Sequence, residues 1–190
     1  MPAALLILNL IDDIASCRGR ANHAFQQLTS REVINRVNAV AIYARVRKIP
    51  VIWSRIGFSD DYHDLPAHSP LFAQMKLVGA LRLHSPGGQW LPDVQIDPVD
   101  LQFHHTGLSA FTGNNLLAWL QRHQRHRLLL GGLSSCLSIE STVREAHERG
   151  IPVTVLEDLC ASDSETSHLQ SMENLQRIAT ITTSLQWMQP

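Results

Sequence analysis

Apolar runs of strand length alternate with segments of helical period along the chain. Six short runs predict buried strands, at residues 4–10, 51–55, 101–103, 127–130, 151–156 and 179–182. Helical spacing between them predicts helices over residues 29–47, 114–122, 138–149 and 164–177. Most of the strands are too apolar to have a solvated face, which favours a parallel sheet covered by helices on both sides. We therefore expect a Rossmann-like, three-layer α/β/α fold with six mainly parallel strands.

Local signals set the ends of two predicted helices. Thr29-Ser-Arg-Glu32 has the spacing of a capping box, which would open the first helix. Gly150 follows the helix over residues 138–149 and is a typical stop. Residues 57–99 show little periodicity and hold five of the nine prolines. We expect this long segment to form short helical turns and to pass over the active-site end of the sheet.

The predicted topology tells where a site should be. In open α/β sheets, ligands bind outside the carboxyl ends of the strands. Candidate residues should therefore lie just after the strands, in the ranges 9–13, 55–61, 104–111, 131–138 and 157–162. Gly131-Gly132 lacks the third glycine of a dinucleotide site and the lysine of a P-loop. No nucleotide or other cofactor is expected.

Composition narrows the class of protein further. The 190 residues fit a single domain spanning 1–190, and a net charge of −1 gives no electrostatic reason to expect nucleic acid. No apolar run approaches the roughly 20 residues of a membrane span, and the first residues predict a buried strand rather than a signal peptide. The three cysteines, Cys17, Cys136 and Cys160, show no metal-type spacing. A reduced, cytoplasmic protein is expected.

Three motifs carry a resemblance to a known family. ALLILNLIDDI (residues 4–14), HHTGLSAFTGNNL (104–116) and GLSSCLSIESTVREAHERGIPVTVLEDLCAS (132–162) follow one another in the order and spacing of the isochorismatase-like, or cysteine hydrolase, family. That family includes nicotinamidases, N-carbamoyl amidohydrolases and isochorismatases. The resemblance covers nearly the whole chain and implies the isochorismatase-like hydrolase fold and a homo-oligomer, dimeric or tetrameric.

The resemblance also implies a catalytic triad whose three positions are substituted here. Family members use an Asp after strand 1 as proton acceptor, a Lys after strand 3 and a nucleophilic Cys at a helix start. With Gly132 and Thr142 as anchors, these positions fall on Asn9, His105 and Ser138. The family turn also implies a cis peptide at Leu133–Ser134 and an oxyanion hole of backbone amides, assigned to Ser134 and Ser138.

The substitutions leave two functional hypotheses open. Asn9 has no titrating proton and cannot act as general base, and a serine is a far weaker nucleophile than a thiolate. The first hypothesis is a homologue without family-type amidase activity that binds a small molecule or serves as a structural partner. The alternative is a serine-dependent hydrolase of a small amide, or a related C–N or ether substrate, in which His105 activates Ser138. An alignment two residues out would instead make Cys136 the nucleophile.

Other residues have a structural and a functional interpretation. Asp12 and Asp13 could offer a displaced carboxylate, but are more typical of a turn that faces water. Asp61-Tyr62-His63 matches the D-x-H of nicotinamidase zinc sites, although it lies past the strand end, and we expect no metal. Cys136 and Cys160 are expected to be core thiols. Among the aromatic residues, Phe111 is the predicted substrate-binding residue of an apolar pocket.

Overall fold

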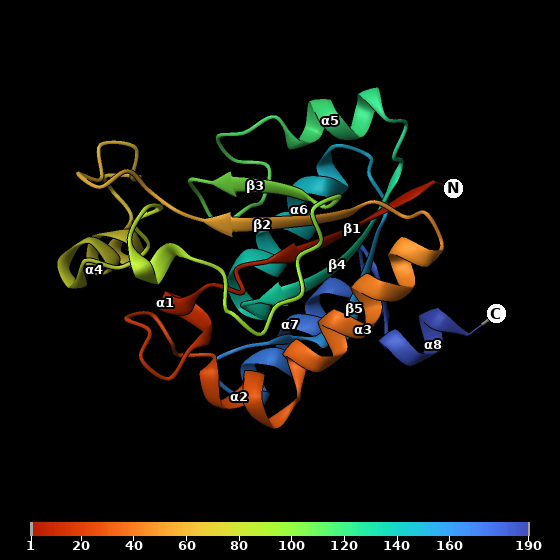
Figure 1. The fold of residues 1–190 in the computed structure, drawn as a ribbon, viewed down its shortest axis with the longest axis horizontal. Helices are drawn as coiled ribbons and strands as arrows, with labels where there is room; N and C mark the ends of the chain where they lie inside the picture. Colours follow the sequence, from red (N-terminus) through yellow and green to blue (C-terminus); the bar gives the residue numbers. More distant parts are fainter. Residues whose placement is uncertain (1, 190) are drawn as a thin grey trace.

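The computed structural model describes residues 2–189 and contains one six-stranded sheet (Figure 1). Its strands are β1 (Ala3–Leu8), β2 (Val51–Ile56), β3 (Leu101–His105), β4 (Arg127–Leu133), β5 (Val153–Ala161) and β6 (Thr180–Thr182). They lie in the order β3-β2-β1-β4-β5-β6, and every neighbouring pair is parallel. The predicted parallel sheet and its six strands are confirmed. Every connection between neighbouring strands therefore crosses over a face of the sheet.

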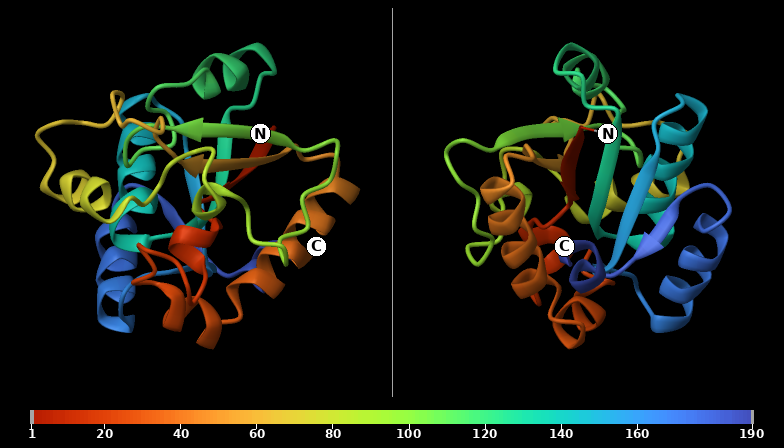
Figure 2. Two further views of the ribbon diagram at one scale, coloured as in Figure 1. Left: turned by 60° about the vertical axis from the view of Figure 1, so that its left-hand side comes forward. Right: turned by 90° about the vertical axis from the view of Figure 1, so that its right-hand side faces the viewer.

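Helices cover both faces of this sheet. One face carries α1 (Asp12–Ala15), α2 (Phe25–Ser30), α3 (Val33–Val46) and α8 (Ser184–Met188). The other carries α5 (Leu116–Arg122), α6 (Glu140–Glu148) and α7 (Glu165–Leu175). Figure 2 shows α3 and α7 on opposite sides of the strands. The three-layer α/β/α architecture is confirmed.

The central strand β1 explains why two helical layers are required. Leu5 and Ile7 pack into the cluster beneath α3, whereas Leu6 and Leu8 pack against the helices of the other face. All four side chains are fully buried. Side chains alternate along a strand, so a strand that is apolar at every position must have both faces covered.

The long segment after β2 forms a projection beside the carboxyl edge of the sheet. It contains α4 (Pro70–Val78) and the short 3-10 turn η1 (Pro86–Gly88). In Figure 1 the arrowheads of β2 and β3 point toward this side, where α1 and α4 lie. Ser69 caps α4 by accepting from the Phe72 amide, and Gly79 ends it in a left-handed conformation. The expected short helical elements near the candidate site are present.

The predicted capping box at Thr29 is wrong. Thr29 lies inside α2, where its hydroxyl donates to the Phe25 carbonyl at 2.9 Å. Glu32 precedes α3 with φ 52°, and its side chain makes no capping hydrogen bond. The chain therefore turns between two helices where one continuous helix was expected. A serine or threonine inside a helix can donate to the carbonyl four residues earlier, whereas one at a helix start accepts from a free amide. The sequence pattern does not distinguish these two cases.

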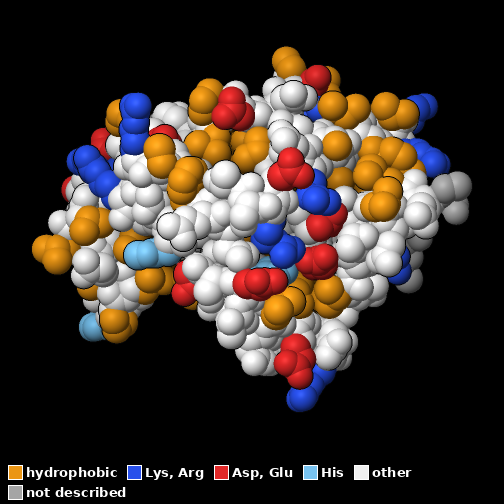
Figure 3. All heavy atoms as spheres, turned by 90° about the horizontal axis from the view of Figure 1, so that it is seen from below, with side chains coloured by type: hydrophobic (Ala, Val, Ile, Leu, Met, Phe, Trp, Pro, Cys, Tyr) orange, Lys and Arg blue, Asp and Glu red, His pale blue; other side chains and the backbone are white. Residues whose placement is uncertain are grey.

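The surface holds charges of both signs. On the face seen in Figure 3, acidic and basic side chains are interspersed among apolar and uncharged ones. Within residues 2–189, no helix is both long and apolar enough to cross a membrane.

Candidate functional site

Asn9, His105 and Ser138 meet at the carboxyl edge of the sheet. Asn9 follows β1, His105 ends β3, and Ser138 lies in the turn after β4. Asn9 bridges the other two: its Oδ1 lies 3.2 Å from His105 Nε2, and its Nδ2 lies 2.9 Å from Ser138 Oγ. All three side chains are at least 96% buried. The structure thus brings together the three residues that the motif alignment selected.

The orientation of the Asn9 amide is fixed by two backbone groups. Its Oδ1 accepts from the Ile56 amide at 2.7 Å, and its Nδ2 donates to the Leu133 carbonyl at 2.8 Å. Turning the amide over would set its NH₂ group against the Ile56 N–H and its oxygen against the Leu133 carbonyl. Nδ2 must therefore donate to Ser138 Oγ. Asn9 has φ 61°, in the left-handed region that asparagine tolerates better than most residues.

The turn that carries Ser138 is a π-helical segment, Ser135–Ile139, which leads into α6. Gly132, the next-to-last residue of β4, has φ 116°, and a Cβ there would lie 2.2 Å from the Leu8 carbonyl oxygen. Only glycine lets β4 approach β1 so closely. The expected cis peptide between Leu133 and Ser134 is present.

Two further contacts hold this turn in place. Thr142 Oγ1 accepts from the Ala110 amide at 3.0 Å, which ties α6 to the loop after β3. Behind the turn, the Ser135 hydroxyl lies 2.8 Å from His168 Nδ1, and His168 Nε2 lies 3.3 Å from Glu157 Oε2. The hydrogen bond with His168 lowers the pKa of Glu157 from its usual value. Ser135 is fully buried, so this serine–histidine–glutamate series supports the turn rather than facing a ligand.

His105 is a neutral imidazole held in one tautomer. Its Nδ1 lies 2.7 Å from the Gly107 carbonyl, which can only accept, so the proton is on Nδ1. Burial lowers the pKa of His105 from 6.5 to about 4. The neutral ring has a single proton, which the shorter contact at Nδ1 takes, so the 3.2 Å approach of Nε2 to Asn9 Oδ1 brings two acceptors together and is not a hydrogen bond. Within residues 2–189, no hydrogen bond joins His105 to Ser138. Asn9 separates this histidine from the serine.

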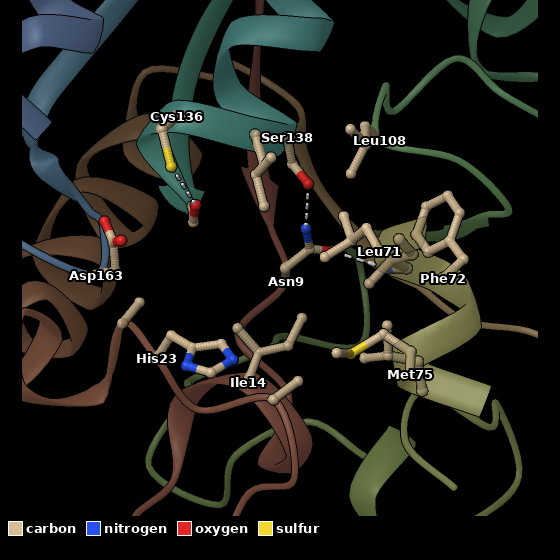
Figure 4. Close-up of a pocket in the computed structure, with 16 residues that line it drawn as sticks. Asn9, Ile14, His23, Leu71, Phe72, Met75, Leu108, Cys136, Ser138 and Asp163 are labelled. Atoms are coloured by element: carbon tan, nitrogen blue, oxygen red, sulfur yellow. Dashed lines mark hydrogen bonds between the residues drawn. The ribbon is translucent and has the colours of Figure 1, made fainter. Parts of the chain in front are cut away.

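A cavity of about 170 Å³ opens beside Asn9 and Ser138 (Figure 4). It is comparable to an engineered cavity of about 150 Å³ that binds benzene. Ser134, Cys136 and Leu137 also line it from the turn after β4, and Asp163 from the turn after β5. The remaining lining is mainly apolar and comes from α1 and the loop after it, from β2, from the projection and from the loop after β3: Ile14, Ala21, His23, Ala24, Ile56, Leu71, Phe72, Met75, Leu81 and Leu108.

The cavity lining differs from the sequence expectations at two residues. Phe111 does not line this cavity; it is 7% exposed, packs in the core with Leu116 and lies beneath the Arg149 guanidinium. The motif after β3 did not specify the direction of its ring. Cys136, expected in the core, is partly exposed and lines the cavity, because the π-helical turn directs it there. Cys160 is fully buried, as expected.

The α4 residues of the pocket were missed by sequence reasoning. Leu71, Phe72 and Met75 all face the cavity from α4. A serine followed by a proline at helix position N1, with a glycine past the end, is a recognisable helix signature at residues 69–79. That signature would have located the helix, although not the face it turns to the site. His23 had no such signal, since it lies outside any motif.

Asp13 and Asp61, the remaining acidic candidates, contact other parts of the protein and do not line the cavity. Asp13 was expected to face water, but it is 3% exposed and accepts from the Leu81 amide at 2.7 Å. It therefore anchors the projection just after α4. Asp61 and His63 are exposed and bond to each other and to Ser59. Within residues 2–189, no three histidine, cysteine or carboxylate side chains are grouped to hold a metal ion.

Comparison with known proteins agrees with this geometry. A model of the isochorismatase domain family matches residues 3–186. The chain therefore belongs to the isochorismatase family.

Similar proteins and structures illustrate the breadth of the family. The chain is 28% identical over 175 residues to the uncharacterized isochorismatase family protein YecD of Escherichia coli O157:H7, covering 90% of this chain and 86% of the relative. It is 26% identical over 171 residues to the ureidoacrylate amidohydrolase RutB of Caulobacter segnis, covering 82% and 70%. The crystal structure of a cysteine hydrolase from Pseudomonas syringae pv. phaseolicola superimposes with a TM-score of 0.86 at 15% identity, covering 98% and 91%. The last of these similarities concerns the fold alone.

Proposed function

We propose that this protein binds a small, uncharged molecule in the cavity and does not hydrolyse amides by the mechanism of its family. The observation that carries the proposal is the hydrogen bond from Asn9 Nδ2 to Ser138 Oγ. A serine must lose its proton to a base before it can attack a carbonyl. The group beside Ser138 at the family's proton-acceptor position is a donor, so it cannot receive that proton.

The alternative, a serine-dependent hydrolase with His105 as the base, is disfavoured by the same geometry. A general base must lie within hydrogen-bond reach of the proton that it takes, directly or through one water. Within the described chain, the contacts of His105 are the Gly107 carbonyl and Asn9 Oδ1, and burial lowers the pKa of its ring to about 4. Protonation of His105 during a reaction would also create a charge in a fully buried position, which is costly.

The lining favours an uncharged ligand. Among residues 2–189, no lysine or arginine lines the cavity, and Asp163 stands on its rim with a carboxylate. Hydrogen bonds lower the pKa of Asp163 from its usual value, mainly the one from Ser167 and to a smaller extent the one from Ser162. The carboxylate therefore remains charged at neutral pH. An anionic ligand would find no lysine or arginine in this lining and would approach a like charge.

One polar contact with the ligand is available at Ser138. Its oxygen already accepts from Asn9, and its own proton has no acceptor within residues 2–189. Because Ser138 is 4% exposed and lines the cavity, that proton can be satisfied by an acceptor atom of a bound ligand. We propose that Ser138 acts as a hydrogen-bond donor to the ligand. The backbone amides of Ser134 and Ser138 remain the proposed sites of the family's oxyanion hole.

Calorimetric titration with benzamide and benzoate tests this proposal. The two molecules have nearly the same size and differ in charge. Benzamide should bind more tightly, and Ser138→Ala should weaken it about 5-fold, the value of one neutral hydrogen bond. Ser141→Ala, a nearby serine that does not line the cavity, is the matched control and should bind normally. Tighter binding of benzoate, or equal binding to wild type and Ser138→Ala, would contradict the proposal.

A further inference from the structure

The three thiols of the chain differ in their access to the cavity. Cys160 is fully buried, and burial raises its pKa to about 12. Cys17 is exposed and does not line the cavity beside Asn9. Cys136 is partly exposed and lines this cavity on the side that also carries Asp163 and His23 (Figure 4). A small molecule in the cavity therefore meets one thiol.

Hydroxyl groups surround the Cys136 sulfur. The Ser162 hydroxyl donates to Sγ at 3.0 Å and also lies 3.2 Å from Asp163 Oδ1, so two acceptors share its proton. The Ser134 hydroxyl lies 3.5 Å from Sγ. Hydroxyl donors stabilise the negative charge that a sulfur carries when it attacks an electrophile. These contacts distinguish Cys136 from a cysteine that merely fills space.

Ser138 provides a second polar group in the lining of the same cavity. Ser138 presents the hydroxyl proton that lacks an acceptor in the described chain, and Asn9 fixes the oxygen that bears it. In Figure 4, Cys136 and Ser138 project from the same turn to different parts of the cavity. A ligand with an acceptor atom at Ser138 can therefore present a different atom to the Cys136 sulfur.

We infer that Cys136 adds covalently to a small, uncharged α,β-unsaturated carbonyl compound whose oxygen is bound by Ser138. In such a compound the electrophilic β-carbon is separated from the carbonyl oxygen by three bonds. This separation suits two groups that act from different parts of one cavity. The inference rests on the proposed function, because it requires the cavity to accept a small uncharged molecule, and it adds chemistry at a residue outside the family's three positions.

The reaction is an addition in which no bond to a leaving group breaks. The sulfur forms a bond to the β-carbon, and the π electrons of the C=C bond move to the α-carbon and carbonyl oxygen. The Ser138 hydroxyl stabilises the enolate through a hydrogen bond. The thiol proton passes to water and ends on the α-carbon. The product is a thioether, formed without an oxidant or reductant.

The test follows the mass of the full-length protein during incubation with cyclohex-2-enone, and peptide mapping assigns the modified cysteine. Cys136 should be modified at least about 10-fold faster than Cys17, and its rate should level off as the enone concentration rises. Saturated cyclohexanone should slow the reaction at Cys136 and leave Cys17 unaffected. Ser138→Ala should slow it about 5-fold, the value of one hydrogen bond. Cys17→Ser should react as wild type, whereas Cys136→Ser should lose the fast adduct.

Two different failures can be told apart. If cyclohexanone does not bind in a calorimetric titration and does not protect Cys136, the cavity does not accept such molecules, and both the proposed function and this inference are wrong. If cyclohexanone binds but Cys136 reacts no faster than the exposed Cys17, the covalent role alone is overturned. Modification of Cys136 that is linear in enone concentration and equally fast in Ser138→Ala would also overturn it.

Discussion

Asn9 donates its side-chain amide to Ser138 Oγ across 2.9 Å, and this direction is imposed by the Ile56 amide and the Leu133 carbonyl. The family resemblance implies an acid at position 9 and a thiol at position 138. In this chain the side chain at position 9 donates to the side chain at position 138, whereas the proton acceptor that the resemblance implies would receive a proton from it. We propose that this arrangement holds Ser138 in place and does not activate it.

Asn9→Asp alone should destabilise the protein. The new carboxylate would be almost fully buried, would face the Leu133 carbonyl and would lack the lysine that pairs with it in the family. An uncompensated buried charge costs about 3 kcal/mol of unfolding free energy. Burial raises the pKa of the new carboxyl, so the loss should grow as pH rises through that pKa. Urea unfolding of the wild type and Asn9→Asp at pH 5 and pH 8 measures this loss of unfolding free energy.

The matched control is the double variant Asn9→Asp, His105→Lys. The lysine restores the opposite charge, so the double variant should recover stability at pH 8 relative to Asn9→Asp. The two substitutions should show a coupling energy of about 1–3 kcal/mol. Additive effects would mean that positions 9 and 105 do not interact as their 3.2 Å contact indicates.

The buried imidazole of His105 should make stability depend on pH. Its pKa is about 4 in the folded protein and 6.5 without burial, so the unfolded chain binds the proton more readily. The contribution of His105 to the free energy of unfolding is complete above pH 6.5. It is lost as pH falls toward 4, and the total loss is about 3 kcal/mol. His105→Gln should reduce this dependence between pH 4 and 6.5. If stability depends on pH in His105→Gln as it does in the wild type, His105 is not held neutral.

Gly132→Ala should be severely destabilising. The added Cβ would lie 2.2 Å from the Leu8 carbonyl oxygen, at a φ of 116° that alanine disfavours. We expect a loss of more than about 3 kcal/mol in the free energy of unfolding, because backbone atoms of β1 and β4 must separate. Gly150→Ala has a positive φ of 69° but nothing within 4 Å, so it should cost only about 1 kcal/mol. Equal losses in the two variants would contradict the close approach.

Asp13→Ala should loosen the projection that carries α4. The substitution leaves the Leu81 amide without its acceptor, at a cost of about 2 kcal/mol. Hydrogen exchange at the Leu81 amide should become faster. Asp12→Ala is the control: the Asp12 side chain makes no hydrogen bond in the described chain, and its removal should leave this amide protected. Unchanged protection in Asp13→Ala would mean that other contacts hold the projection.

The sequence was sufficient to predict the layers and the meeting of the three site residues. Apolar runs such as residues 4–10 predict strands buried on both faces, and parallel strands bring their carboxyl ends to one edge. The family motifs selected Asn9, His105 and Ser138, and each lies at such an end, so the topology places them together. Local capping was less predictable, because the Thr29 hydroxyl satisfies a carbonyl within α2 rather than an amide at the start of α3.

The direction of side chains in the pocket could not be predicted from spacing. Phe111 and Cys136 both follow strands, yet the first turns into the core and the second into the cavity. The difference depends on the loop after β3 and on the π-helical turn, which no motif specifies. The same limit applies to the donor direction of Asn9, since it is set by the Ile56 and Leu133 backbone groups, which are far away in the sequence.

The most direct test of the account is the rate of ammonia release from nicotinamide and benzamide by the wild type, Ser138→Ala and the triple variant Asn9→Asp, His105→Lys, Ser138→Cys. We predict that the wild type releases ammonia no faster than Ser138→Ala, because Ser138 receives a hydrogen bond from Asn9 and has no base. The triple variant should exceed both if these amides enter the cavity, since the three groups act as a unit. Rapid wild-type hydrolysis that is abolished by Ser138→Ala would contradict the account and establish a serine-dependent hydrolase.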